Sequence, residues 1–192
     1  MSEVEAVGAM IGALNAAGIS FLLVGTMSSN AYGIPHSTKN ADFVVKLGSF
    51  PISKLLELLP PGFRMESQIG IETITSARRY RLHFDGASAP FRIDLFEISD
   101  DLHDQERMAT RLETQFQAHK AFIPRAEDVV IAKLRWSKGG QRGIHVDDAR
   151  DVLAVQMGRL DMAYIRGWCD RHGTRELLEE TLKSIPPLPP NS

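Results

Sequence analysis

The order of apolar and polar residues predicts a helix, a strand and a second helix at the start of the chain. Apolar side chains recur at helical spacing at four positions: Val7, Met10, Ile11 and Leu14. A glycine stop follows them, and the apolar run 21–25 then has the length of a buried strand. Gly25 stands where that strand turns directly into a helix, with Thr26 and Ser28 as candidate helix caps.

The middle of the chain has the pattern of a β-sheet. "ADFVVKL" (41–47) predicts a second buried strand, and "PISKLLELL" (51–59) predicts a short helix that begins at a proline. Further strands are expected at 63–67, 71–75, 78–84, 91–98 and within 114–124. The segments 78–84 and 91–98 alternate apolar and polar residues, which is typical of a sheet with one covered face.

Helical periodicity returns after Pro124. Four amphipathic segments follow one another, at 125–137, 145–158, 161–173 and 174–185. We therefore expect an α+β fold, with a mixed β-sheet flanked by helices and a C-terminal helical subdomain. The expected organisation is an α/β core at 1–123, a helical subdomain at 124–185 packed on that core, and a Pro-rich tail at 186–192.

Composition narrows the class of protein. The formal charge of −2 over 192 residues offers no bulk attraction to nucleic acid. The single Cys169 excludes an internal disulfide framework and a multi-cysteine metal site, and it is compatible with a reducing cytoplasm. The N-terminal residues match neither a secretory signal nor a membrane span, so we expect a cytoplasmic protein without a membrane partner.

The turn at Gly25 and Thr26 is the first candidate for chemistry. A strand that opens directly into a helix presents backbone N–H groups and the positive end of a helix dipole, which favour a phosphate group. Such turns are common, and a tight turn without a ligand is the alternative.

Acidic residues on two strands are the second candidate. Asn40 and Asp42 are two residues apart, so they point to the same side of a strand, and Asp94 lies between apolar neighbours on a later strand. If the two strands are adjacent, Asp42 and Asp94 could share a divalent ion. The alternative is that Asp94 pairs with an arginine such as Arg79 or Arg92.

These residues together resemble a known signature. "LLVGTMSSNAYGIPHSTKNADFVV" (22–45) is similar to the signature of the nucleotidyltransferase fold of the polymerase-beta superfamily, and it most resembles small bacterial minimal and AbiEii-like members. "EDVVIAKLRW" and "DDARDVL" resemble the last part of small members of that superfamily. The resemblance covers most of the chain.

The resemblance implies a role for each matching position. Gly25 and Thr26 would hold the phosphates of a nucleoside triphosphate, with Ser28 or Ser29 assisting. Three positions would surround two Mg²⁺ (or Mn²⁺) ions as the catalytic set: Asn40, Asp42 and Asp94. Asp42 and Asp94 would be the charged metal ligands.

Three further positions carry open alternatives. In similar proteins a lysine matching Lys133 approaches the phosphates, and a surface lysine that extends its charge to water is the alternative. Asp148 and Asp151 lie near each other on a predicted helix and are expected to hold Arg150, Arg142 or the loop before them, and a metal site is the alternative.

Three residues depart from the signature. Thr26 stands where Gly or Ser is usual, and His36 stands where Arg is frequent. Asn40 replaces the first aspartate, and its amide offers an oxygen without a charge, so metal binding should be weakened. Glu66 and Glu72 are candidate substitutes for the missing carboxylate.

Two functions follow from the resemblance. The first is a nucleotidyltransferase of weakened activity, which transfers a nucleoside monophosphate from an NTP to an unknown acceptor: a small molecule, a protein or an RNA. The alternative is a catalytically inactive protein of this fold that binds a nucleotide or a protein partner, as in a toxin–antitoxin-like pair.

Overall fold

The computed structural model of the protein describes residues 1–86, 90–139 and 142–186, without the side chain of Arg142. Most of the tail expected at 186–192 therefore lies outside the described residues. The chain divides into two compact units, one of Met1–Ser28 with His36–Arg125 and one of Ser29–Pro35 with Ala126–Ser192. The division falls inside one helix, and each unit is described here by itself.

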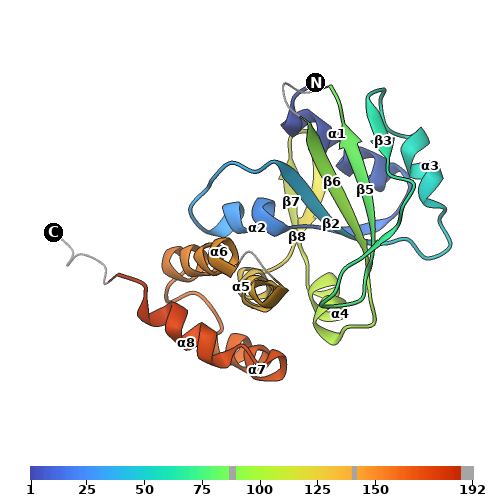
Figure 1. Cartoon of the computed structure of the whole chain (residues 1–192). Coiled ribbons are helices and arrows are strands. Elements are labelled where there is room, and N and C mark those ends of the chain that lie inside the picture. Colours follow the sequence, from blue (N-terminus) through green and yellow to red (C-terminus); the bar gives the residue numbers. More distant parts are fainter. Residues whose placement is uncertain (87–89, 140–141, 187–192) are drawn as a thin grey trace. The chain divides into compact units, whose positions relative to one another are not determined.

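The first unit contains a mixed sheet, shown in Figure 1. Its helices are α1 (Glu3–Ala16), α3 (Ile52–Glu57) and α4 (Leu102–Ala109), and α2 (Gly25–Tyr32) begins in it. Its strands are β1 (Ser20–Val24), β2 (Asn40–Lys46), β3 (Phe63–Met65), β4 (Gly70–Ile71), β5 (Arg78–Phe84), β6 (Phe91–Glu97), β7 (Leu112–Phe116) and β8 (His119–Ile123).

The strand order of the main sheet is β1-β2-β6-β5-β3, and β4 pairs with β5 beside β3. β2 and β6 are parallel, whereas the pairs β1–β2, β5–β6, β3–β5 and β4–β5 are antiparallel. The predicted α+β fold with a mixed sheet is confirmed. The parallel pair joins the two strands that carry the predicted acids Asp42 and Asp94.

One face of this sheet forms the core of the first unit. Phe43 of β2 and Ile93 of β6 are fully buried, and they pack with Met10, Ile11 and Leu14 of α1. Burial of each such side chain contributes about 1.5–3 kcal/mol. Alternate residues of the same strands point to the opposite face, which is where the charged side chains gather.

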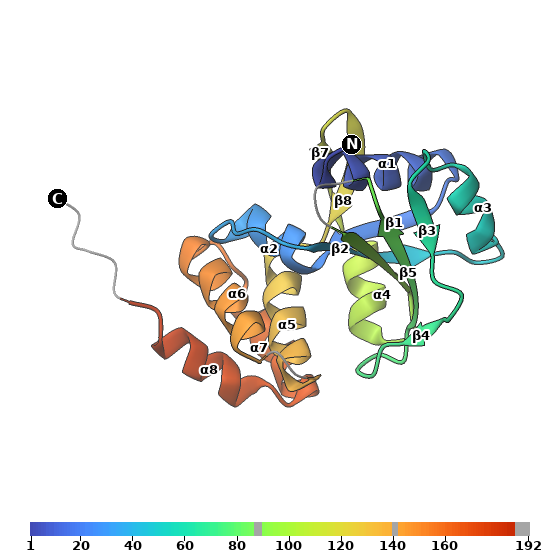
Figure 2. The ribbon, with the colours of Figure 1, turned by 45° about the horizontal axis from the view of Figure 1, so that its top comes forward.

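The hairpin of β7 and β8 forms a separate two-stranded sheet. Figures 1 and 2 show it beside α1, and the Asn15 side chain donates a 2.8 Å hydrogen bond to the carbonyl of Lys120 on β8. The sequence pattern predicted only one strand within 114–124, because the short turn at 117–118 contains no glycine or proline.

Two other local expectations differ from the structure. The strand expected at 71–75 ends at Ile71, because the Glu72 carboxylate accepts hydrogen bonds from the backbone N–H groups of Ile74 and Thr75 and so holds a turn. Helix α4 was not predicted. Asp101 caps it by accepting from the N–H groups of His103 and Asp104.

The second unit is helical. It contains α5 (Ala126–Trp136), the short 3-10 helix η1 (Ser137–Gly139), α6 (Arg142–Val155), α7 (Met162–His172) and α8 (Arg175–Lys183). These helices correspond to the four segments expected after Pro124. Its core includes Ile131, Val152 and the buried Cys169. Among the helices of the described residues, none is long and apolar enough to cross a membrane.

Candidate functional site

Asp42 and Asp94 lie directly opposite each other on the parallel strands β2 and β6. The pairing continues across the sheet, because Arg81 of β5 lies opposite Asp94. Residues opposite each other in register share a face of the sheet. One row of charged side chains therefore crosses three strands, and Asp42 and Asp94 are adjacent, as the sequence predicted for neighbouring strands.

Gly25 lies against the carboxylate of Asp42. Its φ of +66° is a left-handed conformation that L-residues with a side chain rarely adopt. A Cβ added at Gly25 would overlap Oδ2 of Asp42. Helix α2 begins at Gly25, so the turn expected from the sequence is present and its first residue borders the acidic pair.

Thr26 and Ser28 follow Gly25 in α2. The Ser28 hydroxyl is buried and donates a 2.9 Å hydrogen bond to the carbonyl of Gly25, so it holds the turn from within. Thr26 is partly exposed in the first turn of the helix. Of these two hydroxyls, Thr26 is therefore the better placed to meet a ligand from solvent.

Asn40 binds the neighbouring acid. Its side-chain amide donates a 2.8 Å hydrogen bond from Nδ2 to Oδ1 of Asp42. A carboxylate can only accept, so the amide nitrogen must face Asp42 and the amide oxygen must point elsewhere. An aspartate at position 40 could not form this bond, because it would present a second negative charge to Asp42.

Asp94 is only 3% exposed and is held by two arginines. Arg81 donates a 2.8 Å hydrogen bond from Nε to Oδ1, and Nε of Arg92 lies 3.0 Å from Oδ2. The bond to Asp94 is the main cause that raises the pKa of Arg81. The alternative that Asp94 pairs with an arginine is thus confirmed for Arg92, whereas Arg79 takes no part in an ion pair with Asp94 among the described residues.

Sequence reasoning missed Arg81. Its side chain reaches Asp94 from the adjacent antiparallel strand, and the register of β5 on β6 decides which of three arginines on β5 does so. A one-residue shift would have placed Arg81 on the other face. Only the alternation of "RRYRLHF" gave a signal, since it puts Arg79, Arg81 and His83 on one face.

Glu66 lies at the far end of the same row. Nε2 of His83 donates a 2.7 Å hydrogen bond to its carboxylate, and Arg81 lies 4.0 Å away. The bond from His83 is the main cause that lowers the pKa of Glu66. Its nearest described partners are thus basic side chains rather than Asp42, and Glu72 is used in the turn described above.

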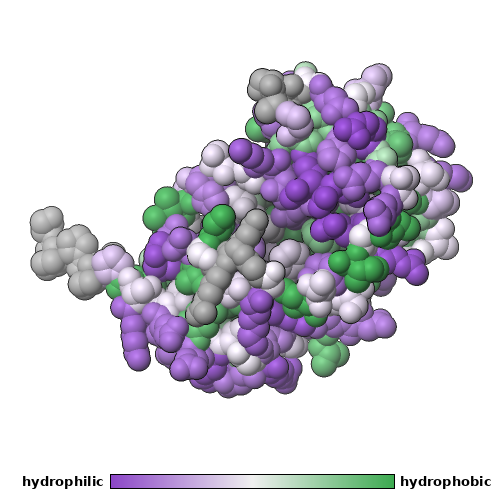
Figure 3. Space-filling view, in the orientation of Figure 1, coloured by the Kyte–Doolittle hydropathy of each residue, from purple (hydrophilic) through white to green (hydrophobic). Residues whose placement is uncertain are grey.

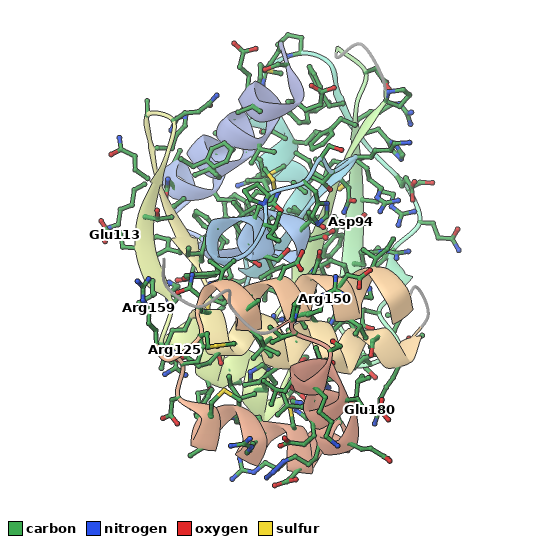
Figure 4. All side chains as sticks on the ribbon, turned by 90° about the vertical axis from the view of Figure 1, so that its left-hand side faces the viewer. Asp94, Glu113, Arg125, Arg150, Arg159 and Glu180 are labelled. Atoms are coloured by element: carbon green, nitrogen blue, oxygen red, sulfur yellow. The ribbon has the colours of Figure 1, made fainter. Side chains whose placement is uncertain are left out.

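The charged row belongs to a polar surface. Figure 3 shows hydrophilic residues gathered over β5 and β6, and Figure 4 shows Asp94 among the side chains of the sheet. On this face the adjacent acids Asp42 and Asp94 are followed by Arg81, and Arg81 and Arg92 both form ion pairs with Asp94.

Ser29 and Lys133 belong to the second unit. The ammonium of Lys133 forms an ion pair with Asp148, and the Ser29 hydroxyl donates a 3.3 Å hydrogen bond to the same carboxylate oxygen. Lys133 is buried, so the alternative of a surface lysine is wrong. Asp148 thus holds Lys133, and Asp151 lies 3.6 Å from Arg150. The side chain of the expected partner Arg142 and part of the loop before it lie outside the described residues.

The oxygen atoms of Asp42, Asp94 and Asn40 can be compared with the coordination that Mg²⁺ prefers. One or two carboxylates together with substrate phosphates commonly bind this ion. Asp42 and Asp94 fit one such ion, provided that an arginine moves away from Asp94. They do not fit a two-ion centre, because Asn40 supplies no charge. Within residues 1–86, 90–139 and 142–186, no group of three or more His, Cys, Asp or Glu side chains is placed to hold a metal ion.

Comparison with known proteins identifies the fold. No protein-family model matches the chain, and no curated protein matches it. An antigenic nucleotidyltransferase-like protein from Paracoccidioides brasiliensis is 18% identical with a TM-score of 0.59, and the match covers 95% of this chain and 93% of that protein. The antibiotic-resistance factor ANT(2″)-Ia in solution is 10% identical with a TM-score of 0.61, over 94% of this chain and 96% of that protein.

A second structure of the resistance factor, ANT(2″)-Ia in complex with adenylyl-2″-tobramycin, is 8% identical with a TM-score of 0.59, and the match covers 90% of this chain and 98% of that protein. Such low identities carry the fold and not the activity. The protein described here has the nucleotidyltransferase fold.

Proposed function

We propose that the protein binds a nucleoside triphosphate beside Gly25 and acts as a nucleotidyltransferase with weakened metal affinity. The observation that carries the proposal is the direct pairing of Asp42 with Asp94 on parallel strands, next to the turn that opens α2. Carboxylates beside the backbone N–H groups that begin a helix suit a divalent ion together with the phosphates of a nucleotide.

The proposed reaction is the transfer of a nucleoside monophosphate. The oxygen of an acceptor hydroxyl attacks the α-phosphorus, the bond to the bridging oxygen breaks, and pyrophosphate leaves while the hydroxyl proton passes to solvent. Backbone N–H groups at the start of α2, with the Thr26 hydroxyl, would bind the phosphates. A divalent ion on Asp42 and Asp94 would neutralise phosphate charge.

Ser28, Ser29 and Lys133 stay proposals as phosphate ligands. Each already has a protein partner: the carbonyl of Gly25 for Ser28, and Asp148 for Ser29 and Lys133. A role in nucleotide binding would require these partners to be shared or exchanged.

A second candidate is a non-catalytic protein that binds a nucleotide or a protein partner. It is favoured by the amide of Asn40 in place of an acid and by the two arginines that already neutralise Asp94. Such a protein would hold the nucleotide without needing a metal ion.

Calorimetric titration with each NTP, in Mg²⁺, in Mn²⁺ and in chelator, distinguishes the nucleotidyltransferase from the non-catalytic binding protein. The transferase predicts that a metal ion strengthens binding of at least one NTP and that Asp42→Asn removes the gain. Equal binding with and without metal would favour the second candidate. A pyrophosphate-release assay with hydroxyl-bearing acceptors then tests the transfer itself.

A further inference from the structure

The two arginines hold Asp94 in different ways. Arg81 donates an aligned hydrogen bond of 2.8 Å from Nε. Nε of Arg92 lies 3.0 Å from the other carboxylate oxygen, yet this buried N–H has no aligned hydrogen-bond acceptor in the described structure. Arg81 is therefore the firm partner, and charge alone holds Arg92 near Asp94.

The exposed fractions of the side chains also indicate that Arg92 is held less firmly than Arg81. The side chain of Arg92 is 41% exposed, whereas that of Arg81 is 23% exposed and that of Asp94 is 4% exposed. Arg92 covers one oxygen of a buried carboxylate and can move into solvent with little loss of packing. Of the two arginines that pair with Asp94, Arg92 is therefore the one that can be displaced more easily.

The position of Arg92 suggests what it exchanges for. It lies opposite Asn40 on β2 and on the same sheet face as Asp42, whose carboxylate contacts Gly25. A guanidinium forms paired hydrogen bonds with a phosphate group, which offers several acceptor oxygens in a suitable plane. A phosphate would satisfy the N–H that Asp94 leaves without an aligned bond.

We propose that Arg92 is a phosphate-binding residue that leaves Asp94 for the triphosphate of an incoming nucleotide and thereby uncovers Asp94 for a divalent cation. The proposal rests on the nucleotide binding proposed above. Nucleotide and cation then both favour the arrangement in which Arg92 has left Asp94, so each increases the affinity for the other.

Arg92→Gln tests this with two opposite effects. Inorganic tripolyphosphate, titrated calorimetrically in chelator, should bind about tenfold more weakly to this variant than to the wild type, because a charged bidentate partner is lost. Mn²⁺ alone, measured by the electron paramagnetic resonance of the free ion, should bind about tenfold more tightly, within the usual range of coupling. A general loss of folding cannot strengthen cation binding.

Arg64→Gln is the matched control. Arg64 lies on the same sheet, in register with His83, and pairs at 2.9 Å with Asp85 at an exposed position. This variant removes the same charge from the same sheet, so it should leave both affinities unchanged. Equal effects of the two substitutions would show a bulk charge effect and overturn the proposal.

Arg92→Lys separates charge from shape. It should keep Mn²⁺ binding weak, because the ammonium still neutralises Asp94, but it should bind tripolyphosphate more weakly than the wild type. If Arg92→Gln matches the wild type in both titrations, Arg92 takes no part in the exchange and the proposal fails.

Titrations with an NTP distinguish the proposed nucleotide-binding function from the proposed exchange of Arg92. If an NTP binds better than tripolyphosphate but Arg92→Gln changes neither NTP nor Mn²⁺ binding, the nucleotide-binding function stands and the exchange fails. If Arg92→Gln weakens tripolyphosphate binding and strengthens Mn²⁺ binding while no NTP binds better than tripolyphosphate, the exchange stands and the nucleotide function fails.

Discussion

The backbone of Gly25 lies in contact with the carboxylate of Asp42, so that any side chain at position 25 would overlap the acid. We expect Gly25→Ala to lower the free energy of unfolding by about 2–6 kcal/mol, because backbone strain and overlap with Asp42 each cost about 1–3 kcal/mol. Urea denaturation measures the loss.

Gly48→Ala supplies the control for this variant. Gly48 has a φ of +58°, and a Cβ there would meet nothing within 4 Å, so its substitution reports backbone strain alone. The difference between the two variants isolates the overlap, and adding Asp42→Ala to Gly25→Ala should remove that difference. Equal losses at positions 25 and 48 would show that Asp42 can move aside.

The two acids should differ in their effect on stability. Asp42→Ala should change the free energy of unfolding by less than ~1 kcal/mol in chelator, because it also removes repulsion with Asp94. Asp94→Ala should cost about 1–3 kcal/mol, because it leaves two half-buried guanidiniums without their carboxylate. A large loss in Asp42→Ala would instead show a structural role for Asp42.

Asn40→Asp restores the acid of the nucleotidyltransferase signature. In chelator the variant should melt a few degrees lower than the wild type, because the bond from Asn40 to Asp42 is replaced by repulsion, and ~1 kcal/mol corresponds to about 2–4 °C in a chain of this size. Mg²⁺ or Mn²⁺ with an NTP should raise its melting temperature more than that of the wild type. Without any added response to millimolar metal, partner binding becomes the better account of function.

Lys133→Met should destabilise the second unit by about 3–5 kcal/mol, because it leaves the buried carboxylate of Asp148 without its cation. The double variant Lys133→Met, Asp148→Leu should recover most of the loss. Lys138→Met is the control, since Lys138 is exposed and donates to the carbonyl of His172 at the protein surface. If the single and double variants lose the same amount, packing and not charge explains the burial of Lys133.

His145 should make stability depend on pH. Burial, and then the charge of Lys133, lower its pKa below 6.5, although Asp148 opposes this. The unfolded chain therefore takes up a proton at a higher pH than the folded chain, and stability falls as pH drops below 6.5 until the folded-state pKa is reached. Chemical denaturation between pH 7.5 and 5 should show a steeper loss for the wild type than for His145→Gln. If the stability of the wild type and of His145→Gln changes equally with pH, the imidazole of His145 is in contact with water and the prediction is wrong.

The sequence predicted the parts of the site that depend on local pattern. Apolar runs around Asp42 and Asp94 identified two buried strands, and the spacing of Asn40 and Asp42 put both on one face. The partners of these residues depend on strand order and register. Periodicity along one segment contains no information about either, so Arg81 was missed.

The same limit applies to Lys133. Its place on a helix followed from the pattern of 125–137, whereas its ion pair joins two helices whose packing no local signal describes. The prediction of a strand at 71–75 was wrong for a different reason. The Glu72 carboxylate accepts hydrogen bonds from the backbone of a turn, and this turn competes with strand pairing.

The row of Asp42, Asp94 and Arg81 also affects how the protein reaches its fold. A slip of β6 by one residue against β2 would turn Asp94 into the apolar core and bring Ile93 or Leu95 to the polar face. An acid placed there without a guanidinium is costly, so misaligned pairings are penalised. The charges that position the candidate site thereby select the correct alignment of its strands during folding.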